Sequence, residues 1–357
     1  MSTVTTPLPF TRTPHLVALV AEAEQLAAML EATDPGPARA ALWSAASLAT
    51  LRLDGSTIPD APTEEQVRAA VAAPAGTDTG ADRGGWHRTM RSALDLDDAH
   101  DEVVWAREFQ GVVDALAADD LADRLLTSPV DALADLHRRL TNGLVGPEHA
   151  GRPRATNQAV HDAAVGRILY FATDPAEVPG ELHRLAGWLG SAAAREHAIV
   201  VSGIVHLELL RIHPFEAANG RLARAAARLV LRARGLDPHG LAVAEIALAE
   251  DAIGTYEEVA RTVRRRDLTI WLERWGEAVT AGLRHAAHAL GVLPDAVPDR
   301  ARDFVGARPG GTFTIMDYRG DVGVGPEEAR ADLAELLDAG LVTRVIGSRG
   351  LRFTAAA

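Results

Sequence analysis

Apolar residues recur three and four positions apart over most of the chain, which is the spacing that places them on one face of an α-helix. These runs are separated by turns rich in Gly, Pro and Asp, such as residues 34–37. The pattern predicts a mainly α-helical protein. The predicted helices cover residues 14–32, 38–53, 63–71, 97–118, 129–144, 178–194, 199–210, 219–234, 241–259 and 268–293.

Two parts of the chain depart from this pattern. Residues 151–160 and 165–172 combine helix-breaking residues with the run Ile168 to Phe171, which favours extended structure, so they predict a short β-hairpin. Residues 298–357 predict a helix, a short extended segment, a second helix and then a strand, a turn and a strand.

Composition limits the function. The 357 residues are enough for one large or two to three ordinary domains. The net charge of -13 argues against general binding to nucleic acid or to anionic membranes. The chain has no cysteine, so neither a disulfide framework nor a thiolate metal site is expected. It shows no secretion signal and no long apolar segment, and a cytoplasmic protein is expected.

The stretch from Ile212 to Arg224 reads I-H-P-F-E-A-A-N-G-R-L-A-R and separates two strongly apolar helical runs. A helix that begins at Asn219 presents unpaired backbone N–H groups, and its dipole attracts an anion to that end. Gly220 has no side chain that would keep a phosphate away from the backbone. The stretch therefore predicts a phosphate site.

Three side chains add chemistry to this site. Arg221 and Arg224 share one face of the predicted helix, and two guanidiniums there suit a polyphosphate. His213 lies at the other lip of the loop, where an imidazole could accept a proton from an attacking hydroxyl. Each residue alone fits an ordinary turn or a solvated helix face, so the prediction depends on their joint spacing.

That spacing resembles the signature of Fic-domain proteins, H-x-F-x-[DE]-[GA]-N-[GK]-R-x-x-R, without insertion or deletion. The resemblance implies a helical enzyme that moves AMP from ATP to a hydroxyl side chain (Ser, Thr or Tyr) of a target protein, or of itself. It also implies that His213 is the general base, that Asn219 and Gly220 form the anion hole, and that Arg221 and Arg224 hold the nucleotide phosphates.

One signature position differs. The family has Asp or Glu there to hold Mg²⁺ on the phosphates, whereas this chain has Ala217. Mg²⁺ normally takes a carboxylate together with substrate phosphates, which a methyl group cannot replace. The neighbouring Glu216 is the one candidate substitute, and its variable position predicts that it faces another way. The resemblance thus implies ATP as the substrate but leaves Mg²⁺ without its usual ligand.

The predicted helix over 38–53 ends in T-L-R-L-D-G, with Gly55 suited to the left-handed residue that follows a helix. An ordinary C-cap accounts for this end. The same residues resemble the inhibitory motif [ST]-x-x-x-[E]-[GN] of some Fic proteins, in which a carboxylate pairs with the second signature arginine. Thr50, Asp54 and Gly55 match it, with Asp in place of Glu, so the resemblance implies that Asp54 contacts Arg224.

The resemblance also gives roles to two further segments. The hairpin before the signature corresponds to the flap on which a target backbone docks by strand addition, and Fic proteins often regulate themselves by homo-oligomerisation. Residues 298–357 resemble a winged helix. Its second helix carries Glu327, Glu328, Asp332 and Glu335 against Arg330 alone, so DNA binding is not expected and a structural or protein-binding role is favoured, with the basic patch Arg344, Arg349 and Arg352.

The predicted organisation has three parts: N-terminal helices with the inhibitory helix (1–60), a Fic core (61–293) and a winged-helix-like domain (298–357). A second functional hypothesis stays open at this point. Because of Ala217, the chain could be a divergent Fic module that binds a nucleotide, transfers another phosphate-containing group, or regulates a partner without catalysis. Three further histidines, His206, His285 and His288, lack carboxylates at ligand spacing and are predicted to be core or surface residues.

Overall fold

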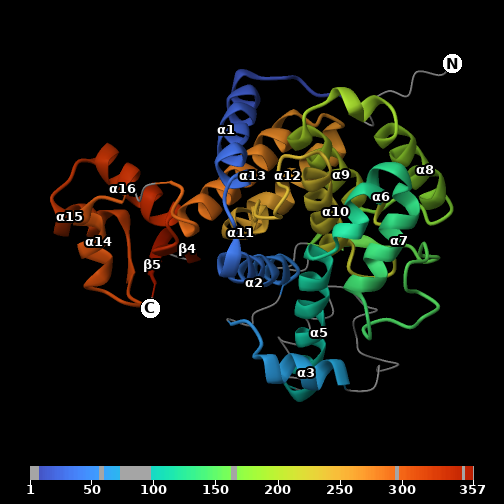
Figure 1. Cartoon of the computed structure of the whole chain (residues 1–357), viewed down its shortest axis with the longest axis horizontal. Coiled ribbons are helices and arrows are strands. Elements are labelled where there is room, and N and C mark those ends of the chain that lie inside the picture. The colour runs from blue at the N-terminus through green and yellow to red at the C-terminus, as the bar shows by residue number, and fades with distance from the viewer. Residues whose placement is uncertain are drawn as a thin grey trace.

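The computed structural model describes residues 8–55, 60–72, 98–161, 167–293, 297–347 and 350–356. Helices dominate this part of the chain, as the apolar spacing predicts (Figure 1). The helices are α1 (Pro14–Glu31), α2 (Gly36–Leu53), α3 (Glu64–Ala72), α5 (Asp98–Leu116), α6 (Asp119–Thr127), α7 (Pro129–Leu140), α8 (Val178–Leu189), α9 (Ala198–Ile212), α10 (Asn219–Ala233), α11 (Ala244–Glu250), α12 (Ala252–Arg265), α13 (Thr269–Ala289), α14 (Asp299–Gly306), α15 (Ile315–Val322) and α16 (Pro326–Asp338), with a short 3-10 helix, η2 (Ala192–Arg195). The strands are β1 (Ala159–His161), β2 (Ile168–Phe171), β3 (Thr312–Phe313), β4 (Val342–Gly347) and β5 (Gly350–Ala355).

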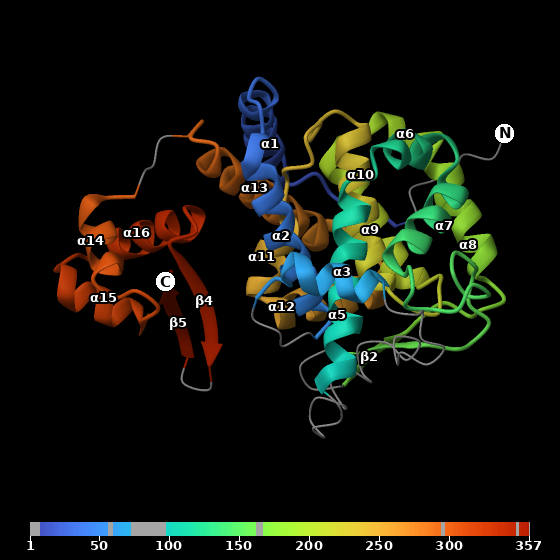
Figure 2. The same cartoon turned by 60° about the horizontal axis from the view of Figure 1, so that its bottom comes forward.

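Helix α9 lies at the centre of the larger helical body (Figure 2). Every residue of α9 except Arg211 is buried, because the helix is apolar on all its faces. Helices α10 and α13 pack directly on it, α1 packs along α13, and α2 packs against α11. The loop that joins α9 to α10 is therefore carried by the two most buried helices of the fold.

Helix α13 approaches α9 closely at Gly203. A Cβ atom at Gly203 would lie 2.8 Å from the ring of Trp275, so no larger residue fits there without a shift. The indole N–H of Trp271 donates to the Gly203 carbonyl (2.9 Å), and that of Trp275 donates to the Ser202 hydroxyl (2.8 Å). These contacts fix α9 against α13 while satisfying both buried indoles.

His206 is a core residue, as predicted, but it is not hydrogen-bonded. Its ring stacks on Trp271 (centroids 5.1 Å apart) and on Trp275 (4.9 Å), and neither ring nitrogen has a hydrogen-bond partner in the described part of the chain. This burial, together with the nearby positive charge of Arg224, lowers the pKa of His206 to about 3. The imidazole is therefore neutral and acts as an aromatic packing group.

The predicted hairpin is present. Strands β1 and β2 pair antiparallel, with Val160 opposite Tyr170, and the connecting residues 162–166 lie outside the described part of the chain. Phe171 and Ile168 of β2 are exposed, whereas the Tyr170 side chain is buried and donates to the Leu210 carbonyl of α9 (3.2 Å). Tyr170 thus attaches the hairpin to the core, while Ile168 and Phe171 stay open to solvent.

The helices differ from the sequence predictions most in three places, besides helix ends such as that of α8, which ends at Leu189 and not at residue 194. Helix α6 was not predicted, although Leu121, Ala122 and Leu125 form its buried stripe. The predicted helix over 241–259 is divided at Asp251, whose side chain accepts from the Gly254 N–H (3.0 Å) and begins α12. Helix α15 was also not predicted, because it is short and depends on a capping box at its first turn.

Residues 297–347 and 350–356 form a C-terminal unit with a hydrophobic core of its own, which includes Phe304, Phe313, Tyr318 and Phe353. Its three strands pair antiparallel in the order β3-β5-β4. The order of elements agrees with the prediction, with α15 added. Its assignment as a winged helix stays an interpretation.

The polar surface of this unit needs one correction. The sequence interpretation counted Asp332 among the exposed acids of α16, but the side chain is buried. It accepts two hydrogen bonds from Arg300 (2.8 and 2.9 Å) and one from the Tyr318 hydroxyl (2.6 Å). It faces inward because its position falls on the apolar stripe of α16. Glu327 and Glu328 are exposed, as predicted.

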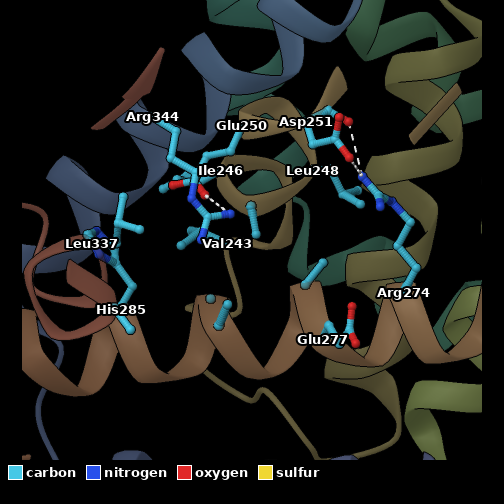
Figure 3. A pocket seen from close by; sticks show the side chains of 15 residues that line it. Val243, Ile246, Leu248, Glu250, Asp251, Arg274, Glu277, His285, Leu337 and Arg344 are labelled. Atoms are coloured by element: carbon cyan, nitrogen blue, oxygen red, sulfur yellow. Dashed lines mark hydrogen bonds and ion pairs between the residues drawn. The ribbon is translucent and has the colours of Figure 1, made fainter. Parts of the chain in front are cut away.

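Of the three arginines in the predicted basic patch, Arg352 is exposed, Arg344 lies 4.0 Å from Glu250 of α11, and Arg349 lies outside the described residues. The Arg344 contact borders a cavity of about 300 Å³ that lies between α11 and α13 and reaches α16 and β4 at one end (Figure 3). An ion pair between Arg274 and Asp251 (2.8 Å) borders its other end. No residue of the signature stretch lines this cavity. None of the described helices is long and apolar enough to serve as a membrane-spanning segment.

The buried His206 predicts a pH-dependent stability. Its pKa is about 3 in the folded protein against an ordinary value of 6.5, so the unfolded chain binds a proton that the folded protein excludes as the pH falls below about 6.5. Stability is therefore lost toward acid. We expect His206→Phe to reduce the slope of unfolding free energy against pH, between about pH 6 and about pH 4, by about 1.4 kcal/mol per pH unit.

Urea unfolding at a series of pH values measures this slope. His183→Gln, at an exposed position on α8, serves as the control and should keep the parent slope. An unchanged slope in His206→Phe would show that this imidazole does not titrate on unfolding.

Candidate active site

The loop between α9 and α10, residues 213–218, is held in a constrained shape. His213 ends α9 with φ at 51°, and Ala218 precedes α10 with φ at 57°, so both adopt left-handed backbone. Such a conformation costs a non-glycine residue about 1–2 kcal/mol and is retained mostly where a site requires it. Two such residues at the two ends of one loop mark it as functional.

Asn219 fastens this loop. Its side-chain oxygen accepts from the Phe215 N–H (2.9 Å), and its side-chain nitrogen donates to the Phe215 carbonyl (2.7 Å). The amide is thus used within the protein. What α10 offers an anion comes from its backbone, because the first intrahelical hydrogen bond runs from the Leu222 N–H to the Ala218 carbonyl (2.8 Å).

Gly220 lies where the site is narrowest. A Cβ atom there would be 2.8 Å from the Asp54 carboxylate and 3.2 Å from the Arg224 guanidinium. Any side chain at this position would occupy the space between the helix end and the charged groups. Because Gly220 has no side chain, a charged group can come close to the backbone at the start of α10, as the sequence predicts.

The two signature arginines point into the same buried region. Arg224 donates to the Thr50 hydroxyl, to the Thr50 carbonyl (3.1 Å) and to Asp54 (2.6 Å). Arg221 lies 3.2 Å from the other Asp54 oxygen and 3.0 Å from Glu108 of α5. Asp54 thus bridges both guanidiniums, which is more than the single contact with Arg224 that the motif implies.

The end of α2 fits both an ordinary helix C-cap and an inhibitory contact with the signature arginines. Asp54 is the C-cap residue, and Gly55 follows it with φ at 89°, as in an ordinary helix end. The same carboxylate also reaches Arg221 and Arg224. An aspartate is long enough because the backbone of α2 comes within hydrogen-bond distance of Arg224, through the Thr50 carbonyl.

The two buried arginines form an anion site, and the Asp54 carboxylate occupies it. Burial alone would lower the pKa of Arg224, but the Asp54 carboxylate and neighbouring groups outweigh it and raise the pKa. Nη1 of Arg221 is buried and has no hydrogen-bond partner within the described residues, and its Nε makes only the ion pair with Asp54. A buried guanidinium with unused donors is costly unless an anion completes its coordination.

The His213 imidazole is neutral and half-buried. Desolvation is the main reason that its pKa is lowered to about 4; the nearby Arg154 lowers it further, while the Leu210 carbonyl and Asp54 act in the opposite direction. Nδ1 lies 3.3 Å from the Leu210 carbonyl, which assigns the proton to Nδ1. Nε2 then carries a lone pair, as a proton acceptor requires.

Arg154 connects the loop to the hairpin. Its backbone N–H donates to the Pro214 carbonyl (2.9 Å), and its buried guanidinium donates to four more carbonyls. These belong to Thr156, Thr173, Ile212 and His213. Burial lowers the pKa of Arg154, with Glu216 acting in the opposite direction. One side chain therefore fixes the His213 backbone and both sides of the hairpin base.

Glu216 faces the hairpin base, away from the phosphate site. Its carboxylate accepts from the Ala155 N–H (3.0 Å), the Thr156 hydroxyl (2.7 Å) and the Gln158 amide (3.2 Å). Desolvation raises the pKa of Glu216, but these hydrogen bonds outweigh it and lower the pKa. The structure thus agrees with the expectation that Glu216 points elsewhere.

His137 of α7 contacts the loop and holds it in place. Its Nε2–H donates to the Ala217 carbonyl (3.1 Å), its Nδ1 accepts from the Gly151 N–H (2.8 Å), and its ring stacks on Phe215 with centroids 4.1 Å apart. Desolvation lowers its pKa to about 4, so the ring is neutral. This tautomer allows both ring nitrogens to be used at once.

Sequence reasoning did not single out Arg154, His137 or Glu108. His137 left a signal, because it interrupts the apolar stripe of α7 formed by Leu133, Leu136 and Leu140. A polar residue at a core position predicts a specific partner. Arg154 and Glu108 left none, since their roles depend on contacts with elements that are distant in the sequence.

Comparison with known proteins agrees with this site. Residues 126–231, which include the loop, match the sequence model of the Fic/DOC family. Protein adenylyltransferase fic-1 of Caenorhabditis elegans is 31% identical over 110 residues, and protein adenylyltransferase Fic of Nematostella vectensis is 30% identical over 110 residues. The matches cover 30% of this chain but only 20% and 24% of those two proteins.

A solved structure shares the whole fold. A Fic family protein from Desulfovibrio desulfuricans G20 superposes with a TM-score of 0.60 at 22% identity, over 98% of both chains. The helical body with its hairpin is therefore a Fic-type fold. The match of residues 126–231 to the Fic/DOC family model agrees with the resemblance of the signature.

The Arg154 contacts predict a large loss of stability on truncation. Arg154→Ala leaves several buried carbonyls without a donor, so we expect the free energy of unfolding to fall by about 3 kcal/mol. Arg154→Lys should fall in between, because one ammonium cannot reach all four carbonyls. Chemical denaturation measures both. The exposed neighbour Arg152 provides the control, and Arg152→Ala should stay within about 0.5 kcal/mol of the parent.

Proposed function

We propose that this chain is a protein adenylyltransferase that moves AMP from ATP to a hydroxyl side chain of a protein, and that Asp54 holds it inactive. The observation that carries the proposal is the bridging of two buried arginines by Asp54 at the start of α10, with a neutral imidazole at the other end of the same loop. The names of the two curated relatives support the same activity.

The proposed reaction uses groups that already lie in the site. The nucleotide phosphates take the place of the Asp54 carboxylate beside Arg221 and Arg224, next to the backbone N–H groups at the start of α10. The target hydroxyl oxygen attacks the α-phosphorus, and its proton passes to Nε2 of His213. The bond from the α-phosphorus to the bridging oxygen breaks, and pyrophosphate leaves with that electron pair while the guanidiniums balance its charge.

The hairpin supports a protein substrate. Phe171 is 77% exposed and Ile168 is 50% exposed, both on β2, and a two-stranded sheet presents backbone groups that an extended peptide can pair with. Arg154 ties the base of this hairpin to the His213 carbonyl. A peptide paired with the hairpin would thus be held at a fixed position relative to the His213 imidazole.

A second function, binding a nucleotide or partner without this transfer, is favoured by one observation. Position 217, where the family signature has a carboxylate for Mg²⁺, carries a methyl group that is only 4% exposed, so the usual ligand for the metal of the transfer reaction is missing there. Incorporation of label separates the two hypotheses, since only the first requires His213 as a base.

The inhibitory contact predicts activation on removal of Asp54. We expect Asp54→Gly to raise incorporation of α-labelled ATP into itself or into lysate proteins by at least about tenfold, because displacing an ion pair worth about 1.4 kcal/mol is no longer needed. His213→Ala in that background should reduce incorporation by about a hundredfold or more. Asp60→Gly, at an exposed position before α3, is the matched control and should match the parent.

If neither Asp54→Gly nor the parent is labelled while ATP still binds, the second function is supported instead.

The neutral imidazole predicts the shape of the pH profile. The pKa of His213 is lowered to about 4, so its basic form persists well below the ordinary midpoint of 6.5. In Asp54→Gly the loss of the nearby carboxylate removes an influence that raises this pKa. We expect the labelling rate to stay level between about pH 8 and about pH 6. A rate that halves near pH 6.5 would show that His213 has an ordinary pKa.

A further inference from the structure

The position that the family signature reserves for a cation ligand carries no ligand side chain in this protein. Ala217 is only 4% exposed, and its methyl group has no donor atom. Its backbone carbonyl accepts the Nε2–H of His137 (3.1 Å), so that oxygen is already used. Mg²⁺ requires oxygen ligands in nearly octahedral geometry, and position 217 offers none.

The neighbouring carboxylate cannot take over without dismantling the loop. Both oxygens of Glu216 accept hydrogen bonds from residues 155–158, and the Glu216 carbonyl accepts another from Gln158 (3.0 Å). Turning Glu216 toward the phosphates would leave the Ala155 N–H and the Thr156 hydroxyl without their acceptor, which destabilises the loop. Glu216 therefore belongs to the hairpin.

The carboxylates that do lie in the site are paired with cations. Asp54 bridges Arg221 and Arg224, and Glu108 contacts Arg221. Asp54 must leave before phosphates can enter, so it does not stay as a ligand. Across the described ranges, no three His, Asp or Glu side chains are grouped so that they could hold a metal ion. The residues present do not fit Mg²⁺.

We infer that this site binds nucleotide phosphates without a divalent cation held by the protein, and that guanidiniums carry the neutralisation. The inference deepens the proposed function and rests on a nucleotide entering here. Its positive support is Arg221, whose buried Nη1 has no hydrogen-bond partner in the described structure and is available to a phosphate oxygen, while its Nε is paired with Asp54 (3.2 Å) and becomes available when Asp54 leaves. Displacement of Asp54 releases the second guanidinium, that of Arg224.

The test measures binding rather than activity. ATP is titrated calorimetrically into the full-length Asp54→Gly protein, once in EDTA and once in excess Mg²⁺, at equal ionic strength. We expect the two dissociation constants to agree within about threefold. In the same background Ala217→Asp should weaken ATP binding in EDTA by about tenfold, because a carboxylate then faces the phosphates, and Mg²⁺ should restore it.

Ala217→Asn is the matched control: it has the size of the aspartate without its charge, and should show no restoration by Mg²⁺. A gain of tenfold or more from Mg²⁺ in Asp54→Gly itself overturns the inference while leaving the proposed function in place. Failure of ATP to bind in either buffer overturns the proposed function and this inference with it. The comparison in Asp54→Gly needs no change at position 217, so it stands if the Ala217 variants do not fold.

A spectroscopic measurement checks the metal directly. Mn²⁺, which takes the same ligands as Mg²⁺, loses its free-ion EPR signal when it is bound. With ATP present, we expect Asp54→Gly to remove no more of this signal than ATP alone, and Ala217→Asp to remove more. Extra loss with Asp54→Gly itself would reveal a ligand in the protein and contradict the inference.

Discussion

The contact between Asp54 and the two arginines of α10 is the interaction on which the site depends. Burying a guanidinium is expensive unless a counter-charge accompanies it, and here two guanidiniums lie at 6% and 4% exposure. The counter-charge comes from α2, a helix that is outside the matched domain of residues 126–231. The ion pairs thus join the N-terminal part of the chain to the centre of the domain. A phosphate has the same sign of charge as a carboxylate and can pair with the same guanidiniums. An anion of this kind is therefore what we expect to displace Asp54 from the site.

The loop itself is held by polar contacts that do not involve the ligand. Asn219 bonds both backbone groups of Phe215, His137 bonds the Ala217 carbonyl, and Arg154 bonds the His213 carbonyl. These contacts compensate for the two left-handed residues in the loop. The geometry around His213 is therefore set by the protein itself, and the proposed reaction would require little reorganisation there.

The helices and the loop before α10 could be predicted because their signals are local. The spacing of apolar residues gave the helices, and the signature stretch gave Arg221, Arg224 and Gly220 in positions where the structure brings them together. Boundaries set by a single side chain, such as Asp251 at the start of α12, were missed. So were partners contributed from far along the chain, since the sequence of α5 does not reveal that Glu108 meets Arg221. Asp332 is a second example of this limit. Its charge predicted an exposed side chain, and only the contact with Arg300 explains why it is buried.

The change at position 217 and the pairing of Glu216 have one physical consequence in common. In a site that uses a cation ligand, a carboxylate beside the phosphates must be kept away from cationic side chains, or they neutralise each other. In this protein Glu216 is committed to the hairpin, and Asp54 is committed to the arginines until it is displaced. The remaining field at the start of α10 therefore comes from the guanidiniums and the helix N–H groups, together with the Glu108 carboxylate that contacts Arg221. In the proposed nucleotide complex, two oxygens of a tetrahedral phosphate could each accept from one planar guanidinium, so selectivity for the ligand would rest on Arg221 and Arg224 and not on a bound ion.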